Sequence, residues 1–260
     1  MNKKMILQIL NIVSFIAAVI INYLAISLPL GYGTTQELSD AIPNLFVPAG
    51  LTFSIWGVIY ILLGLFSIYQ IRDIFKSDKI EMPYVEKVSV FFIISNLANL
   101  TWILLWHYQL VPLSLVAMLI ILVMLLLIYL RLKIGKAEVS KIEKWAVHVP
   151  FSVYLGWITV ATIANVTAVL VILGIPNGVT FPSVLAEILT IVVIVVAVLI
   201  TFLMLFLRKD VAYSLVVLWA LLGIFLKQFP LNLTTGITAL VALIVIFIGI
   251  IYIAIEYFRK

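Results

Sequence analysis

Long apolar runs recur along the chain and are separated by short polar segments. Each run holds about 17 to 25 residues, the length at which an α-helix crosses the ~30 Å hydrocarbon layer of a bilayer. A helix is the only open-chain structure that satisfies its own backbone hydrogen bonds there. The pattern therefore predicts eight spans, at 5–30, 51–71, 88–108, 111–131, 146–173, 183–207, 211–228 and 235–256.

The seventh run is short and ends at Lys227-Gln228, so it could be re-entrant in a seven-span arrangement. The positions of the basic residues help to choose between seven and eight spans. With eight spans, fifteen of the sixteen Lys and Arg fall on one side of the membrane, and only Lys227 falls on the other. Cytoplasmic loops carry an excess of Lys and Arg. We therefore favour eight spans in the cell membrane, multi-pass, with both termini cytoplasmic. The first run is too long for the core of a cleaved signal peptide, so we expect a retained helix.

Three of the predicted spans carry aromatic and polar side chains at spacings of three and four. These spacings place side chains on one face of a helix. We interpret the three faces as converging on one pocket inside the bundle, because stacked indoles suit a flat, apolar ligand. Core packing of the same side chains is the alternative. The faces consist of Phe53, Trp56, Tyr60, Gly64 and Ser67; of Asn96, Asn99, Trp102 and Trp106; and of Tyr154, Trp157, Ala161 and Asn165.

Several of these residues have a simpler structural interpretation. Intramembrane Asn99 and Asn165 could hold helices together by hydrogen bonds, or line a pocket as functional polar groups. Trp106 lies near a span end, where tryptophans commonly form an interfacial belt. Trp56 and Trp157 lie five or more residues inside their spans, so a belt explains them less well.

The predicted connection from Gly31 to Gly50 is long and contains no Lys or Arg. A loop of this length over a bundle is either a lid or a loose connector. Tyr32, Phe46 and Pro48 favour a packed lid over the outer end of the pocket.

Composition supports the membrane assignment. Hydrophobic residues make up 65% of the 260 residues and charged residues 10%, whereas a soluble domain carries about 25% charged residues. We predict an all-α, polytopic membrane helix bundle of about eight transmembrane helices. The net charge of +5 does not indicate nucleic-acid binding, because the basic residues are confined to short loops.

The titratable residues suggest no catalytic site. The chain has no cysteine and only two histidines, which argues against thiol catalysis and against a zinc site. His107 and His148 fall at predicted helix ends on opposite sides of the membrane, so we expect each to be a solvated interfacial histidine. Glu187 could act as a proton site or extend to the interface. No Ser-His-Asp arrangement, paired carboxylates or phosphate-binding glycine loop is visible.

Three motifs resemble the TspO/MBR family of tryptophan-rich sensory proteins, which includes the mitochondrial translocator protein. They occur in the family's order on the corresponding helices and cover about residues 1–175. The motifs are Trp56-Gly57-Val-Ile-Tyr60-Ile-Leu-Leu-Gly64 with Pro48 upstream, Asn99-Leu-Thr-Trp102, and Tyr154-Leu-Gly-Trp157-Ile-Thr-Val-Ala161-Thr162-Ile-Ala-Asn165.

The resemblance implies a five-helix bundle, often dimeric, with a pocket roofed by the loop between its first two helices. It implies binding of porphyrins such as protoporphyrin IX or haem, with no required cofactor. The lipid bilayer and a hydrophobic small molecule would be the partners, and a homodimer would be allowed. Carried over by position, the ligand-binding residues are Trp56, Tyr60, Asn99, Trp102, Trp157, Ala161 and Asn165, with Phe46 and Pro48 in the lid loop.

The chain also departs from the family pattern. Ala49 stands where the family has a second proline, and no Tyr-x-Arg/Lys follows Asn165, which argues against cholesterol binding. We divide the chain into a TspO/MBR-like bundle, 1–175, and a three-helix extension, 176–260.

From this resemblance we expect a membrane receptor or sensor that binds a planar tetrapyrrole between the second, third and fifth spans. A small-solute transporter or permease is the second hypothesis. A membrane enzyme that transforms the bound pigment is the third.

Overall fold

The computed structural model describes residues 3–28, 30–174 and 183–258, and within these ranges the chain is helical with no strand. Eight helices are long and apolar enough to cross a membrane, as predicted, so the seven-span alternative is not needed. They are α1 (Lys3–Ser27), α3 (Ile55–Gln70, entered through the 3-10 turn η1, Gly50–Ser54), α4 (Pro83–His107), α5 (Val111–Leu132), α7 (Val149–Ile172), α8 (Val184–Arg208), α9 (Val211–Gln228) and α10 (Leu233–Phe258).

Three shorter elements complete the described fold. The helix α2 (Thr35–Asp40) lies in the connection between α1 and η1. One turn of helix, α6 (Lys141–Glu143), and a π-helical segment, η2 (Lys144–His148), lead into α7.

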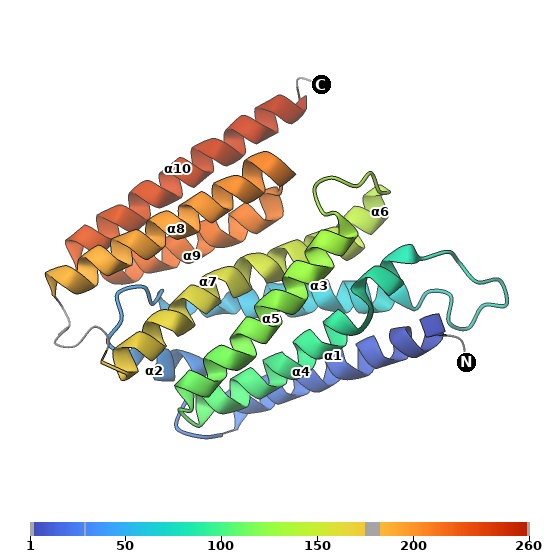
Figure 1. Cartoon of the computed structure of the whole chain (residues 1–260), viewed down its shortest axis with the longest axis horizontal. Coiled ribbons are helices and arrows are strands. Elements are labelled where there is room, and N and C mark those ends of the chain that lie inside the picture. Colours follow the sequence, from blue (N-terminus) through green and yellow to red (C-terminus); the bar gives the residue numbers. More distant parts are fainter. Residues whose placement is uncertain (1–2, 29, 175–182, 259–260) are drawn as a thin grey trace.

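The spans form two packed groups (Figure 1). Helices α1, α3, α4, α5 and α7 make one bundle, and α8, α9 and α10 lie against its α7 side. Of the last three helices, α9 makes the main contact with α7. The start of α1, the α6 segment and the end of α10 lie at the same end of the molecule, as eight alternating spans require.

Aromatic rings fill the centre of the first bundle. Phe66 of α3, Phe92 of α4 and Phe151 of α7 are fully buried and meet edge to face, with ring centroids 4.9–5.5 Å apart. Edge-to-face pairs of this kind stabilise a core beyond the area they bury. This cluster fixes the distance between the three helices that carry the polar-aromatic faces.

The third span, α4, is broken near its start. Ser89 has φ 47° and ψ −142°, values outside the helical region, so the helix is kinked there. Arg131 of α5 donates hydrogen bonds to the carbonyl oxygens of Lys87 and Glu86. A side chain from the next helix thus satisfies backbone groups beside the break, at the exposed end of the helix.

A buried carboxylate connects the two groups of helices. Asp210 caps α9, where its Oδ1 accepts a hydrogen bond from the Tyr213 N–H at 3.1 Å. Its Oδ2 accepts hydrogen bonds from the hydroxyls of Tyr129 (2.8 Å) and Ser152. One side chain from the loop between α8 and α9 therefore binds both α5 and α7, which holds the last three helices against the first bundle.

The expectation that both histidines are solvated is wrong. His107 is fully buried, with Nε2 3.1 Å from Thr35 Oγ1 and Nδ1 3.3 Å from the Leu30 carbonyl oxygen. His148 is only 5% exposed. Position at a helix end does not predict exposure here, because α2 covers the end of α4 and the π-helical turn directs His148 inward. Glu187 also has a partner, since Asn232 Nδ2 donates to its Oε1 at 2.6 Å.

An ion pair joins the start of α1 to the connection between α3 and α4. Lys4 Nζ lies 2.6 Å from Asp73 Oδ2, and the Asp73 side chain is only 1% exposed. Burial by itself raises the pKa of the Asp73 carboxyl. Hydrogen bonds from Lys4 Nζ, Gln8 Nε2 and the Ile80 N–H, together with the Lys4 charge, outweigh that effect and lower the pKa to about 2.

We predict that Asp73→Asn lowers the thermal midpoint of the detergent-solubilised protein at pH 7. The pKa of Asp73 is lower in the folded protein than the ordinary value of 3.8. The ionised carboxylate therefore contributes fully to the free energy of unfolding at any pH above 3.8. It is lost as the pH falls through about 2. A shift of this size corresponds to roughly 2 kcal/mol. The difference in thermal midpoint between wild type and variant should therefore disappear as the pH is lowered from 4 to 2. Exposed Asp78→Asn is the control, and a gap that persists at pH 2 would contradict the assignment.

Candidate functional site

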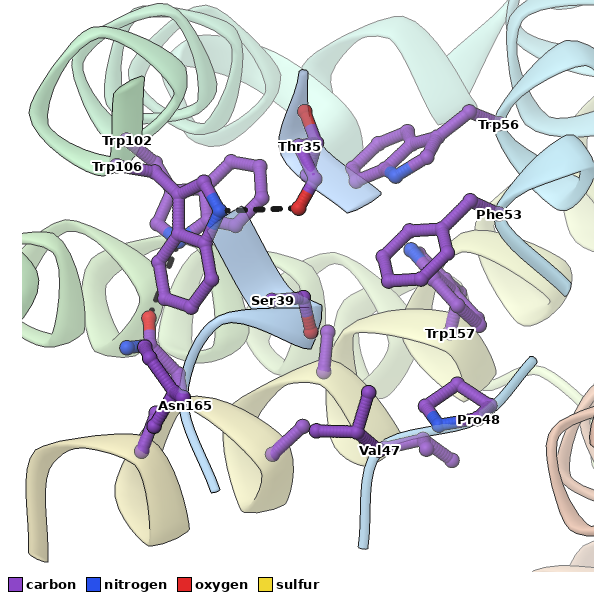
Figure 2. A pocket seen from close by; sticks show the side chains of 15 residues that line it. Thr35, Ser39, Val47, Pro48, Phe53, Trp56, Trp102, Trp106, Trp157 and Asn165 are labelled. Atoms are coloured by element: carbon purple, nitrogen blue, oxygen red, sulfur yellow. Dashed lines mark hydrogen bonds between the residues drawn. The ribbon is translucent and has the colours of Figure 1, made fainter. Parts of the chain in front are cut away.

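The predicted aromatic faces surround a pocket at the end of the bundle covered by α2 (Figure 2). It lies between η1 and α3 on one side and α4 and α7 on the others. The cavity has a volume of about 50 Å³. The empty space around it, which includes open solvent at the mouth, amounts to about 600 Å³. The lining residues are almost all apolar: Thr35, Ser39, Ile42, Val47, Pro48, Phe53, Trp56, Trp102, Trp106, Trp157, Val160, Ala161, Ala164, Asn165 and Ala168.

Trp56 is the centre of the aromatic arrangement. Its ring stacks on Tyr60 at 5.6 Å and on Trp102 at 6.3 Å, and it meets the edges of Trp157 at 6.2 Å and Tyr154 at 6.1 Å. Spans α3, α4 and α7 therefore do turn their rings toward one interior space. The rings touch one another around that space, which explains why the cavity is small.

Asn165 both lines the pocket and joins helices. Its Oδ1 accepts a hydrogen bond from Trp102 Nε1 at 3.1 Å, and its amide exchanges hydrogen bonds with Ser114 Oγ at 3.2–3.3 Å. Three spans, α4, α5 and α7, meet at this amide. The amide therefore joins helices, as the first interpretation expected, and it also lies in the pocket lining, where it bonds the Trp102 indole; a functional role for it stays a prediction.

Tyr60 and Asn99 do not line this pocket. Tyr60 lies behind Trp56, where its ring lines a separate apolar groove of about 360 Å³ between α1 and α3. Asn99 is 1% exposed, and its Oδ1 accepts a hydrogen bond from Asn22 of α1 at 2.7 Å. Among the seven residues proposed for ligand binding, Trp56, Trp102, Trp157, Ala161 and Asn165 lie at the pocket wall.

The roof is a short helix that is stabilised at its own start. Thr34 and Glu37 form a reciprocal capping box, and their hydrogen bonds lower the pKa of the Glu37 carboxyl. Trp106 Nε1 donates to the Thr35 carbonyl oxygen at 3.3 Å. Trp106 is only 6% exposed and stacks on Trp102 at 5.8 Å, so its interpretation as an interfacial belt residue is wrong. The helix α2, absent from the sequence prediction, is what buries it.

The rest of the connection packs down as a lid. Pro48 lines the cavity, whereas Phe46 is 1% exposed and lies beneath the loop, outside the lining. Asn44 holds this stretch in place: its Nδ2 donates to Thr167 Oγ1 of α7 at 2.6 Å, and its Oδ1 accepts from the Phe46 N–H at 2.9 Å. Tyr32 is the exception to the expected packing, because it is 71% exposed.

Helix α9 supports the lid from the outside. The Ala49 N–H donates to the Gly223 carbonyl oxygen at 2.9 Å, and Trp219 Nε1 donates to the Thr52 carbonyl oxygen at 3.0 Å. Lys227 forms an ion pair with Asp40 at the end of α2. The last group of helices therefore contributes to the pocket by fixing its roof and its η1 wall, although none of its residues is in the lining.

The pocket provides aromatic surfaces and few hydrogen-bonding groups. Trp157 is 3% exposed, and its buried Nε1 has no hydrogen-bond partner in the described part of the chain. The Ser39 hydroxyl faces the cavity from the lid (Figure 2), whereas the Thr35 hydroxyl lies 3.1 Å from His107 Nε2 and is not free for a ligand. No lining residue is ionisable, and the described residues contain no cluster of His, Asp and Glu able to hold a metal.

Sequence patterns missed the lid side of the pocket. Thr35 and Ser39 contribute to the lining from the short helix α2 and Ile42 and Val47 from the loop after it, and this stretch is too short to show a helical period in the sequence. One signal was available: Thr34 followed three residues later by Glu37 is the capping-box pattern that announces a helix start. The small residues Ala164 and Ala168 follow Ala161 at helical spacing and could have been added to the third face.

Comparison with known proteins gives one match. A family model described as TSPO-like protein matches residues 8–252. No curated protein and no solved structure matches the chain. The match continues through α8 and α9 and into α10, and the division of the chain near residue 175 stays a prediction.

We predict that Gly223→Ala destabilises the protein by about 1–3 kcal/mol, the usual range for overpacking. A Cβ at this position would lie 1.9 Å from Thr52 Oγ1 and 3.0 Å from Pro48 Cβ, so either α9 or the lid would have to move. Gly57→Ala is the matched control. Its Cβ would meet nothing within 4 Å, and alanine is the better helix former. Thermal midpoints in detergent should fall for the first variant and stay level or rise for the second. Equal thermal midpoints for the two variants would show that α9 is not tightly packed against the lid.

Proposed function

This chain belongs to the TSPO-like protein family, and on that premise we propose that it is a membrane receptor or sensor for a planar hydrophobic ligand. The ligand class is a porphyrin-type tetrapyrrole, bound between α3, α4 and α7 beneath α2. The basic residues gathered at the end of the bundle that holds the α6 segment support a cytoplasmic location for both termini.

The arrangement of indoles carries this proposal. Trp56, Trp102 and Trp157 come from three different spans and meet at one almost wholly apolar cavity. A flat conjugated ligand gains stacking with such rings in addition to the burial of its apolar surface. The unpartnered Trp157 N–H could donate a hydrogen bond to a polar edge of the ligand, which would help to orient it.

The size of the cavity requires the pocket to open. Ligand pockets for molecules of drug size measure roughly 300–1,000 Å³, whereas this cavity measures about 50 Å³. We expect the lid to be the part that moves. It packs on the spans through Leu38 and Phe46, and side-chain contacts at its ends help to hold it closed. The Lys227–Asp40 ion pair and the Asn44–Thr167 hydrogen bond are two of these contacts. We therefore infer that binding displaces α2 and inserts the ligand between the rings.

The lining favours a metal-free porphyrin over haem. Proteins hold haem iron through His, Cys, Met or Tyr. None of the described residues that line the pocket is of these types. A haem would therefore gain no axial ligand, and the contacts available to it would be the same stacking contacts that a metal-free ring makes.

We predict that Trp157→Leu weakens protoporphyrin IX binding at least ten-fold, because it removes a stacking surface and the free N–H. Binding is measured by titrating the purified protein and following the porphyrin absorbance band with quenching of the remaining tryptophans. Trp145→Leu is the control, since Trp145 is 66% exposed and lies outside the pocket. Equal affinities for the two variants, or no saturable binding by wild type, would overturn the proposal.

We also predict that Lys227→Met speeds ligand association by two- to five-fold. The change releases Asp40 at the end of α2, and a partly exposed ion pair contributes up to about 1 kcal/mol. Stopped-flow fluorescence at several porphyrin concentrations gives the rate. Lys209→Met, which removes the Lys209–Glu256 pair at the other end of the molecule, should leave the rate unchanged. The same rate in both variants would mean that this contact does not hold the lid closed.

A further inference from the structure

A continuous line of buried polar side chains runs between α1, α3 and α4, apart from the aromatic pocket. We call it the polar seam. No polar face was assigned to the first span from the sequence, yet the inward face of α1 is polar, while isoleucines and valines face outward. The seam consists of Gln8, Asn11, Ser14 and Asn22 of α1, Ser67 and Gln70 of α3, Asn96 and Asn99 of α4, and the buried hydroxyl of Tyr60, whose side chain is otherwise half-buried.

Hydrogen bonds connect the seam to the Lys4–Asp73 ion pair. Gln8 Nε2 donates to Asp73 Oδ1 at 3.1 Å and also to the Gln70 carbonyl oxygen. One turn further along α1, Asn11 Nδ2 donates to Gln70 Oε1 at 2.9 Å. The Asp73 end of the seam is its open end, because the Lys4 side chain there is 20% exposed.

The inner part of the seam continues toward the aromatic pocket. Asn96 Nδ2 donates to Ser14 Oγ at 3.1 Å, and Asn22 Nδ2 donates to Asn99 Oδ1 at 2.7 Å. On α3, Gln70, Ser67 and Tyr60 follow one helix face over about 15 Å. Tyr60 stacks directly on Trp56, so the seam ends against the back of the pocket.

The seam contains most of the unsatisfied polar atoms in the described structure. Seven buried side-chain nitrogen and oxygen atoms have no hydrogen-bond partner there, and five of the seven lie in the seam. A buried polar atom left unpaired costs about 1–3 kcal/mol, so five in one place call for an explanation. The five are Asn11 Oδ1, Tyr60 Oη, Ser67 Oγ, Gln70 Nε2 and Asn99 Nδ2.

The mixture of donors and acceptors identifies the occupant. A cation would satisfy only the oxygens and an anion only the N–H groups, whereas water satisfies both. Exchanging the nitrogen and oxygen of Asn11 and Gln70 together does not change this conclusion, because one donor and one acceptor would still be unpaired. Gly64 lies between Tyr60 and Ser67 on α3, and a methyl group there would contact the Phe15 ring of α1 at 3.9 Å, so α1 and α3 approach closely beside these hydroxyls.

We propose that the polar seam binds a file of water molecules that enters at Asp73 and reaches Tyr60 behind the aromatic pocket. Buried waters typically make two to four hydrogen bonds to polar groups that the protein itself leaves unpaired. The file makes the interior of the bundle accessible to water from one side of the membrane. It also brings water to the hydroxyl of Tyr60, whose ring stacks on Trp56 at the back of the aromatic pocket.

The natural absence of cysteine allows a direct test in proteoliposomes. Ser67→Cys places a thiol in the seam, and Ile68→Cys places one at the next position, which is 69% exposed on the lipid-facing surface. Ag⁺ in chloride-free buffer is the probe, because thiols ionise and react only where water reaches them. After timed exposure the protein is denatured, and the remaining thiol is counted with a maleimide dye.

We expect the Ser67→Cys thiol to be blocked at least ten-fold faster than the Ile68→Cys thiol. Equal rates, or a faster reaction at position 68, would overturn the proposal. This experiment uses no porphyrin. A negative result would therefore reject the water file without rejecting the receptor function, and failure of porphyrin binding would not reject the water file.

A second measurement uses variants that each delete one unpaired hydroxyl. In a hydrated seam, Tyr60→Phe and Ser67→Ala lose a hydrogen bond to water and lower the thermal midpoint by roughly 2–4 °C. In a dry seam they remove an unsatisfied group and raise it. Ser95→Ala is the reference for a lost hydrogen bond, since its hydroxyl donates to the Phe92 carbonyl oxygen at 2.8 Å. A rise for both seam variants would overturn the proposal.

Discussion

A polar group inside a membrane bundle has to find its partner within the protein, and this requirement organises the whole molecule. The Asp210 carboxylate accepts three hydrogen bonds and thereby joins α5, α7 and α9. The Asn165 amide does the same for α4, α5 and α7. In lipid, apolar contact between helices gives little driving force, because the acyl chains are equally apolar. Buried polar groups therefore decide which helices meet and in what rotation.

The same requirement explains how the pocket and its cover are connected. The backbone of the long connection after α1 carries N–H and C=O groups that must be paired, and α4 and α9 supply partners for several of them. Gly223 and Trp219 of α9 bind the loop at Ala49 and Thr52. The last three helices are thus part of the support of the pocket, and the two groups of helices act on the same structure even though only the first forms the lining.

The aromatic pocket and the polar seam meet at one pair of rings. Trp56 belongs to the pocket and Tyr60 to the seam, and the two stack at 5.6 Å. A ligand that displaces Trp56 would move Tyr60, whose hydroxyl is one of the unpaired atoms of the seam. The structure therefore contains a short physical connection between a site suited to a hydrophobic ligand and a polar path toward the Lys4–Asp73 end of the bundle.

The sequence by itself determined the eight spans and the aromatic faces, because run length and helical period depend only on local geometry and on the thickness of the bilayer. It placed Trp56, Trp102 and Trp157 correctly for the same reason. Tertiary structure decided what those patterns cannot contain: that α2 covers Trp106 and His107, that Asn99 binds α1 rather than the cavity, and that α1 turns Asn11 and Gln8 inward. These outcomes depend on which helices are neighbours and how each is rotated, and hydrogen-bond partners more than fifty residues apart in the chain fix both.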